Sequence, residues 1–425
     1  MHVSVFLPFA VFVFAYGLVS RRIDRTILTA PILAVAYGIA LGPAGFEVIH
    51  LDMGGEVTRL LAEITLALVL FHDAARIDLR RLRGDVGLPA RLLGPGLLGT
   101  VALGFGVGLV LLPGLSGWEI ALLAALLAPT DAALGQAVVT QKAVPLRVRQ
   151  ALNVESGLND GLVVPLVAVL TACAAGQSAD SAWTWVAHAG RALGYGVFGG
   201  AAVGLVAAKL LDRAEASGWM HAGSRRVAVA SVPMIAFFAA EALGGSGFLA
   251  AFLAGLALGS TTHHIERHLY DFTEDSGELL GQVTWVVFGV AAAPAALECG
   301  TPGVILYALL SLTLIRMLPV ALALRGVGFS PRTVMFIGWF GPRGLASVVF
   351  ALAVLGEPEI AGAESLFGVA VWTILLSVVL HGATSAPVAR AYGASVDEID
   401  DPAAVEFPAP RSSRISDPAP PAPGP

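Results

Sequence analysis

Charged residues and cysteine are both scarce in this chain. Asp, Glu, Lys and Arg make up 13% of its 425 residues, whereas an ordinary soluble domain carries roughly 25%. Hydrophobic residues make up 56%, and the mean hydropathy is +0.79. The two cysteines, Cys173 and Cys299, are too few for a disulfide scaffold or a four-cysteine metal site. The composition therefore predicts a polytopic membrane protein and excludes a soluble one.

Thirteen apolar stretches are long enough to cross about 30 Å of hydrocarbon as helices that rise about 1.5 Å per residue. Arg21, Arg22 and Arg25 follow the first stretch instead of preceding it, so we expect a retained helix and not a cleaved signal sequence. The sequence thus predicts an all-α protein with thirteen transmembrane helices. The stretches are residues 3–20, 26–42, 57–76, 91–112, 118–140, 150–173, 183–208, 226–243, 246–260, 275–297, 302–324, 332–355 and 365–389.

Among the loops between these stretches, only every second one carries Lys or Arg. Short cytoplasmic loops carry an excess of Lys and Arg. We therefore expect a multi-pass protein of the cell inner (plasma) membrane, with its N-terminus outside and its C-terminus in the cytoplasm. The loops that hold neither Lys nor Arg are 43–56, 113–117, 174–182, 244–245, 298–301 and 356–364.

The charged residues inside the spans suggest an internal repeat. Acids at mid-membrane depth fall in spans five and six, and two deep arginines fall in spans eleven and twelve. This offset predicts two inverted six-helix repeats, 1–175 and 225–392, joined by a linker helix at 183–212. Secondary transporters use such repeats for alternating access around a midplane site. The whole transmembrane domain is expected at 1–392, followed by a disordered, Pro-rich cytoplasmic tail at 393–425.

One polar stretch stands out because it lies where the chain should be inside the bilayer. It reads Asn-Val-Glu-Ser-Gly-Leu-Asn-Asp-Gly at 153–161, in span six. Charges at this depth are costly and mark ion binding, proton relay or charge pairing. At about 100° per residue, four of its polar side chains share one flank of a helix. That flank, on which we place the function, carries Glu155, Ser156, Asn159 and Asp160.

Two arginines, Arg316 and Arg343, also lie well inside apolar stretches. Each needs a buried carboxylate or carbonyl partner. The mid-membrane acids available as partners are Asp131, Glu155 and Asp160.

Proline and glycine interrupt spans five and twelve at mid-depth. Span five contains Leu-Ala-Pro-Thr-Asp-Ala-Ala at 127–133, and span twelve contains Gly-Trp-Phe-Gly-Pro-Arg-Gly at 338–344. Both motifs predict unwound backbone, which a bilayer tolerates only where it lines a cavity or is buried in protein. We therefore expect the two breaks to face each other beside Asp160.

These motifs resemble those of the monovalent cation:proton antiporters, and among them the electroneutral sodium/proton exchanger branch. The resemblance covers all thirteen spans. It is carried by Ala-Pro-Thr-Asp at 128–131, Glu-Ser-Gly-Leu-Asn-Asp-Gly at 155–161, Arg316 in span eleven and Gly-Pro-Arg-Gly at 341–344. Four motifs in this order make the resemblance specific.

The resemblance implies that Asp160 holds the cation and the proton in turn. It also implies that Asp131, the Thr130 backbone and Ser156 complete a sodium shell, which Asn159 steadies. Carboxylate, hydroxyl and carbonyl oxygens suit a hard cation such as sodium. Because burial disfavours the charged form of a carboxylate, a proton can compete with the cation for it.

Three further charged residues have supporting roles by the same resemblance, and a fourth, Asp73, is considered because of its position in the sequence. Glu155 is expected to form a structural ion pair with Arg316, and Arg343 to place its charge in the unwound part of span twelve. Asp73 lies near the cytoplasmic end of span three, where an acid can gather cations. A charge that snorkels to the headgroups is the alternative for this residue.

These observations predict a secondary transporter that exchanges Na⁺ or Li⁺ for H⁺ by alternating access. A ratio of 1:1 follows from Asn159, which stands where electrogenic relatives carry a second aspartate. The same oxygens also serve K⁺, so a K⁺/H⁺ antiporter is the alternative. A cation channel is disfavoured because the polar residues cluster at one depth, and a purely structural ion-pair network because buried pairs stabilise weakly.

An enzyme is not expected, since the chain has no His-Glu-x-x-His motif and no nucleophile paired with a base in the spans. The expected partners are the transported cation and proton, the lipid bilayer and a second copy in a homodimer; no cofactor or nucleic acid is expected.

Four histidines stay outside this assignment. His263, His264 and His268 lie in a cytoplasmic loop, where a solvated loop is favoured over metal binding or pH sensing. His381, in span thirteen, marks a bend or simply packs there.

Overall fold

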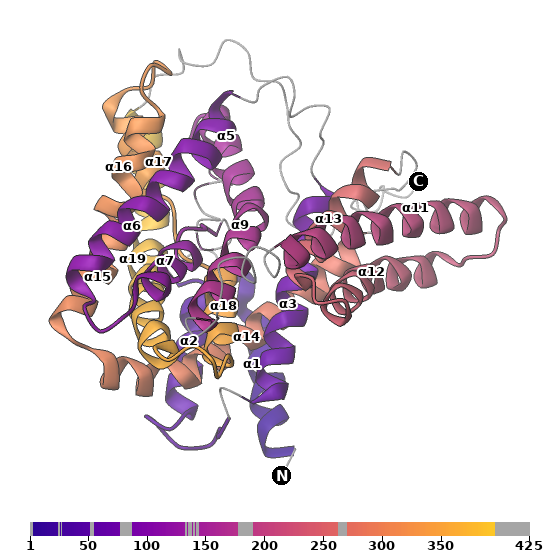
Figure 1. Ribbon diagram of the computed structural model, residues 1–425, viewed down its shortest axis with the longest axis horizontal. Coiled ribbons are helices and arrows are strands. Elements are labelled where there is room, and N and C mark those ends of the chain that lie inside the picture. Colours follow the sequence, from indigo (N-terminus) through magenta and orange to yellow (C-terminus); the bar gives the residue numbers. More distant parts are fainter. Residues whose placement is uncertain are drawn as a thin grey trace, which may run out of the picture.

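The computed structural model in Figure 1 describes residues 3–23, 26, 28–51, 55–76, 87–131, 134, 138, 141, 144–176, 190–261 and 270–395. Within these residues the regular elements are all helices, and none is a strand. The loop with His263, His264 and His268 lies outside the described residues, and so does the expected tail beyond residue 395. The all-α prediction is therefore confirmed for the described part of the chain.

Helices in the first part of the chain follow the predicted apolar stretches. A π-helical turn, η1, joins α5 to α6 around Pro95, which cannot donate a backbone hydrogen bond. The elements are α1 (Val3–Ile23), α2 (Ala30–Leu41), α3 (Glu56–Ala75), α5 (Gly87–Arg91), η1 (Leu92–Gly96), α6 (Leu97–Leu111), α7 (Gly117–Leu126) and α9 (Leu146–Ala175).

The second part of the chain has shorter helical segments where spans eleven and twelve were predicted. Span eleven is divided at Thr313, and span twelve between Trp339 and Leu345. The elements are η2 (Tyr195–Gly199), α11 (Gly200–Ala216), α12 (Ala222–Ala242), α13 (Gly247–Thr261), α14 (Asp271–Cys299), α15 (Pro302–Leu312), α16 (Leu314–Ala323), α17 (Pro331–Trp339), α18 (Leu345–Leu355) and α19 (Ala363–Ser395).

Six helical stretches in the described residues are long and apolar enough to cross a membrane. Other apolar helices, such as α13 and α18, are shorter. The six are Gly87–Leu111, Leu146–Ala175, Gly190–Ala216, Asp271–Cys299, Pro302–Ala323 and Ala363–Ser395.

Small residues allow the helices to approach each other closely. A Cβ added to Gly38 of α2 would overlap the Val286 carbonyl of α14, and one added to Gly289 of α14 would overlap the Val35 carbonyl of α2. Close backbone approach through small residues is the usual means of helix packing in lipid. Figure 1 shows α11 and α12 projecting to one side of the molecule, and α13 packs against both of them and against α3.

Candidate functional site

The site is built where two broken helices meet. α7 ends at Leu126, and residues 128–131 are not helical because Pro129 cannot continue the helix. The Asp131 N–H donates to the Pro342 carbonyl at 2.9 Å, and the Leu345 N–H donates to Asp131 Oδ2 at 3.1 Å. The unwound part of span five therefore lies directly against the unwound part of span twelve.

Asp131 occupies the N-terminal end of α18. Its carboxylate accepts from the first helical N–H, and the positive end of a helix dipole favours a negative charge there. Gly344 is required for this contact, since a Cβ at that position would overlap the Asp131 carboxylate. The presence of glycine at position 344, the last of the Gly-Pro-Arg-Gly motif, is thus explained by the lack of space for a side chain.

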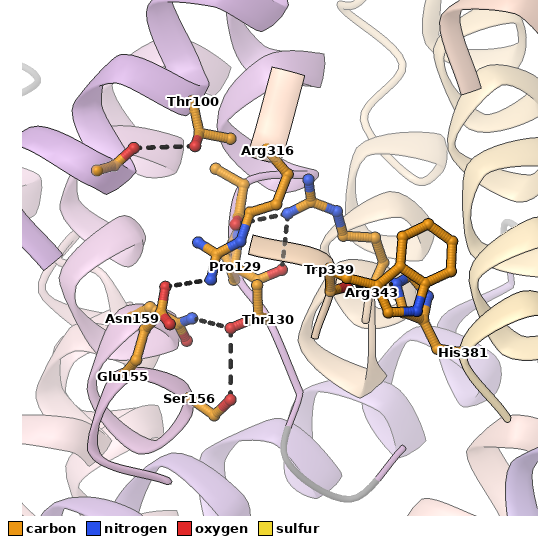
Figure 2. A network of polar contacts seen from close by, with 12 residues as sticks. Thr100, Pro129, Thr130, Glu155, Ser156, Asn159, Arg316, Trp339, Arg343 and His381 are labelled. Atoms are coloured by element: carbon orange, nitrogen blue, oxygen red, sulfur yellow. Dashed lines mark hydrogen bonds and ion pairs between the residues drawn. The ribbon is translucent and has the colours of Figure 1, made fainter. Parts of the chain in front are cut away.

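Arg343 binds carbonyl groups at the C-terminal ends of two other helices, α7 and α15. Its side chain is completely buried. Nη1 donates to the Ala128 carbonyl at 2.7 Å and to the Pro129 carbonyl at 3.3 Å, and Nη2 donates to the Ser311 carbonyl at 2.9 Å. These carbonyls follow the C-terminus of α7 or belong to the last turn of α15, where a positive charge is favourable. Figure 2 shows the Arg343 guanidinium beside Arg316 and the Pro129 segment.

The division of span eleven at Thr313 explains one of these contacts. Thr313 has φ −113° and ψ −96°, which interrupts the helix between α15 and α16. This interruption leaves the Ser311 carbonyl available to Arg343. Span eleven was predicted as one continuous helix, and no proline or glycine at Thr313 could have indicated the interruption.

α9 presents the polar flank predicted from the sequence. Asn159 Nδ2 donates to Thr130 Oγ1 at 2.7 Å, and Thr130 Oγ1 lies 3.4 Å from Ser156 Oγ (Figure 2). Asn159 is buried, whereas Ser156 is partly exposed. Asn159 therefore holds the unwound segment at Thr130 against α9.

Glu155 lies on the same flank and reaches α16. Its Oε1 is 2.6 Å from Arg316 Nη2, and the two side chains are 3% and 1% exposed. Figure 2 shows this pair next to Asn159. α9 is thus joined to span eleven by an ion pair and to span five by a hydrogen bond.

Asp160 differs from Glu155 and Asn159 on the same flank because it is partly exposed. Within the described part of the chain, it makes no hydrogen bond or ion pair. The carboxylates of Asp131 and Asp73 lie close enough for their charges to act on that of Asp160. Asp73 also acts on Asp131 from α3 and is itself partly exposed. On the polar flank of α9, Asp160 is therefore the accessible carboxylate, whereas Glu155 is buried against Arg316.

Some supporting residues were not singled out by sequence patterns. Ser347 of α18 is buried and donates to the Leu126 carbonyl at 2.8 Å, at the end of α7. Ser377 of α19 accepts from the Arg343 N–H at 2.6 Å. A hydroxyl on a helix is a weak signal by itself, because it becomes informative only once the broken backbone beside it is known.

A model of a protein family described as sodium/hydrogen exchanger, transmembrane, matches residues 9–391. The chain belongs to this sodium/hydrogen exchanger family. It is accordingly a multi-pass membrane protein, and the resemblance inferred from the four motifs is confirmed.

Relatives in the family carry names with different cations. The K(+)/H(+) antiporter NhaP2 of Shewanella sp. (strain ANA-3) is 28% identical over 384 residues, which cover 88% of this chain and 63% of the relative. The Na(+)/H(+) antiporter ApNhaP of Aphanothece halophytica is 24% identical over 369 residues, which cover 81% of this chain and 67% of the relative. The chain thus spans less than two thirds of the length of the NhaP2 relative.

A solved structure shares the fold. The sodium proton antiporter MjNhaP1 from Methanocaldococcus jannaschii matches with a TM-score of 0.72 and 22% identity, covering 91% of this chain and 97% of that chain. The fold of this chain is therefore similar to that of MjNhaP1.

Proposed function

We propose that this protein exchanges a monovalent cation for protons across the plasma membrane by alternating access. The observation that carries the proposal is the state of Asp160, which is accessible and has no partner among the described residues. The other acid on its flank, Glu155, is occupied by Arg316. Asp160 is therefore the carboxylate available to a cation or a proton.

The surroundings of Asp160 offer the oxygen ligands that a hard monovalent cation prefers. We assign the cation shell to Asp160, Asp131, Ser156 and the Thr130 backbone. Asn159 supports the shell by binding Thr130. Asp73, which acts electrostatically on both aspartates, is the acid that attracts cations toward them.

The charges around the site explain why transport is coupled. Arg316 offsets Glu155, and Arg343 lies at the same pair of breaks as Asp131. Either a bound monovalent cation or a bound proton then neutralises Asp160. An empty site would carry an unpaired carboxylate through the membrane, which is costly. The site consequently crosses loaded with one ion or the other.

The finer architecture belongs to the same proposal. Thirteen spans in two inverted repeats place the breaks of spans five and twelve at the midplane. The contact between Asp131 and Pro342 supports such a crossing. The distribution of Lys and Arg supports an outer N-terminus and a cytoplasmic C-terminus.

Sodium is the proposed cation, because the motifs resemble the electroneutral sodium/proton exchangers. Potassium is the second candidate, since relatives such as NhaP2 are named K(+)/H(+) antiporters. Proteoliposomes with an internal pH dye, exposed to Na⁺, Li⁺ and K⁺ in turn, distinguish the two. We expect Na⁺ and Li⁺ to drive proton movement and K⁺ to have little effect. A response to K⁺ alone reassigns the cation, and no response beyond that of protein-free vesicles refutes antiport.

A prediction about charge balance follows from the single carrier. With Asp160 as the only group that alternates, one proton moves against one cation and no net charge crosses. Moving one charge through 100 mV is worth about 2.3 kcal/mol, so an electrogenic cycle responds strongly to voltage. Na⁺-driven exchange measured with and without a potassium/valinomycin potential should therefore reach the same end point.

A voltage-dependent end point would contradict the 1:1 ratio. It would mean that a second acid, Asp131 or Asp73, also carries a proton. Repeating the measurement on Asp73→Asn and Asp131→Asn would then identify that acid, because its removal abolishes the dependence on voltage.

A further inference from the structure

The break in span twelve leaves buried backbone groups that need partners. α17 ends at Trp339 and α18 begins at Leu345, so the Trp339 carbonyl and the Arg343 N–H lie at the two ends of a non-helical segment. Buried backbone groups without partners are costly. α19 passes beside this segment, and its residues Ser377 and His381 are completely buried.

Ser377 and His381 lie one helical turn apart and contact the two ends of the break. Ser377 Oγ accepts from the Arg343 N–H at 2.6 Å. His381 Nε2 is 2.9 Å from the Trp339 carbonyl oxygen, and His381 Nδ1 is 3.2 Å from Ser377 Oγ. The ring of Trp339 also packs on that of His381, with centroids 4.9 Å apart (Figure 2).

The shortest of these contacts, from Nε2 to the Trp339 carbonyl, indicates the tautomer of His381. A carbonyl oxygen only accepts, so Nε2 must carry a proton in order to bind Trp339. Ser377 Oγ accepts from Arg343 and keeps its own hydrogen, which it donates to an unprotonated Nδ1. The neutral ring with its proton on Nε2 satisfies the Trp339 carbonyl and Ser377 Oγ. The Ser377 carbonyl oxygen also lies 3.2 Å from Nδ1, but it is inside α19, where the helix backbone is its partner. A second proton would add a positive charge close to the guanidinium groups of Arg343 and Arg316, which both act on this ring.

We propose that His381 and Ser377 are positioning residues that hold the break in span twelve at a fixed length for cation binding. They act through Arg343 and Pro342. The Arg343 side chain donates to the Ala128 and Pro129 carbonyls, and the Pro342 carbonyl accepts from the backbone N–H of Asp131.

Ser377 and His381 form a bridge between the two ends of the break. The consequence of this bridge for transport rests on the proposed exchange function. If the break lengthens, the carboxylate and carbonyl ligands beside Asp160 move. Outer partners of metal ligands typically change affinity by about 10–100-fold when they are lost. The bridge therefore bears on the affinity of the site for its cation.

The apparent KM for Na⁺ in proteoliposomes tests this role, with rates normalised to folded, inserted protein. His381→Leu keeps an apolar volume but loses both hydrogen bonds, and Ser377→Ala loses the link to Arg343. Each should raise the apparent KM about tenfold. His381→Gln supplies an N–H and a carbonyl oxygen in similar places and should stay within about twofold of wild type. A histidine that only packs would lower the thermal midpoint and leave the KM of the folded fraction unchanged.

Thr373→Val is the matched control on the same helix. Thr373 is also completely buried, but its hydroxyl donates to the Val369 carbonyl within α19 itself. The apparent KM of Thr373→Val for Na⁺ should equal that of wild type. The proposal is overturned if His381→Leu and Ser377→Ala keep the wild-type KM, if His381→Gln is as impaired as His381→Leu, or if Thr373→Val raises the KM equally.

A measurement without transport keeps the bridge testable by itself. Nitrogen NMR of protein labelled at histidine, with the signal assigned by its loss in His381→Gln, reports which ring nitrogen carries the proton. We expect protonated Nε2 and unprotonated Nδ1. An Nε2 without a proton overturns the bridge, because it cannot donate to the Trp339 carbonyl. If wild-type protein exchanges no cation, the proposed function fails, whereas the NMR result still decides whether His381 joins the two ends of the break.

Discussion

Vesicles that contain Asp160→Asn should show no proton movement when Na⁺, Li⁺ or K⁺ is added. The asparagine amide has nearly the same shape as the carboxylate, but it neither releases a proton nor offers a negative charge to a cation. Because Asp160 has no hydrogen bond or ion pair within the described residues, its replacement should leave folding intact. Exchange should fall to the level of protein-free vesicles while the thermal midpoint in detergent is preserved.

Asp275→Asn is the matched control for Asp160→Asn. Asp275 is exposed near the start of α14 and belongs to none of the interactions at the two breaks. This variant should exchange like wild type. Clear exchange by folded Asp160→Asn would remove Asp160 from its assigned role and would direct attention to Asp131 or Asp73.

The sequence was sufficient to locate the broken backbone and the polar flank. Pro129 and Pro342 stop helices for a local reason, because proline lacks a backbone N–H and clashes with the preceding turn. Helical periodicity alone placed Glu155 and Asn159 on one flank, and the structure buries both. Such features depend on a few neighbouring residues, which is why they can be predicted from one chain.

The partners of the buried arginines could be predicted only in kind. Arg343 needed a carboxylate or a carbonyl, and the structure gives it three carbonyls. One of them, that of Ser311, becomes available through the interruption at Thr313, where the sequence has no helix-breaking residue. Tertiary packing sets this interruption, so local propensity does not indicate it.

His381 illustrates the same limit. As a lone histidine in an apolar span, it gave no reason to prefer a bend over ordinary packing. Its importance depends on the Trp339 carbonyl, which lies 42 residues away along the chain and is left free by the break in span twelve. The contact between His381 and the break can be recognised only in the structure, where α19 lies beside α17.

The second large effect is expected at the ion pair between α9 and α16. Glu155→Gln or Arg316→Gln alone leaves one buried charge without its partner, which typically costs about 3–5 kcal/mol of the free energy of unfolding. The double variant leaves no charge and should be more stable than the sum of the two single losses predicts. A coupling of about 1–3 kcal/mol is expected from unfolding by SDS titration in detergent micelles.

The remaining polar atoms of the pair strengthen this expectation. In the described part of the protein, Glu155 Oε2 and Arg316 Nε and Nη1 have no hydrogen-bond partner. A buried pair with unsatisfied atoms contributes little net stability, although losing one member is costly.

The surface pair Arg59 and Glu63 is the control for this cycle. Arg59 Nε and Glu63 Oε1 are 2.7 Å apart, but the Arg59 side chain is 39% exposed. The coupling energy between these two residues should therefore not exceed about 1 kcal/mol. If the Glu155 and Arg316 losses simply add, the two residues are not energetic partners, and α9 must be held to span eleven by other contacts.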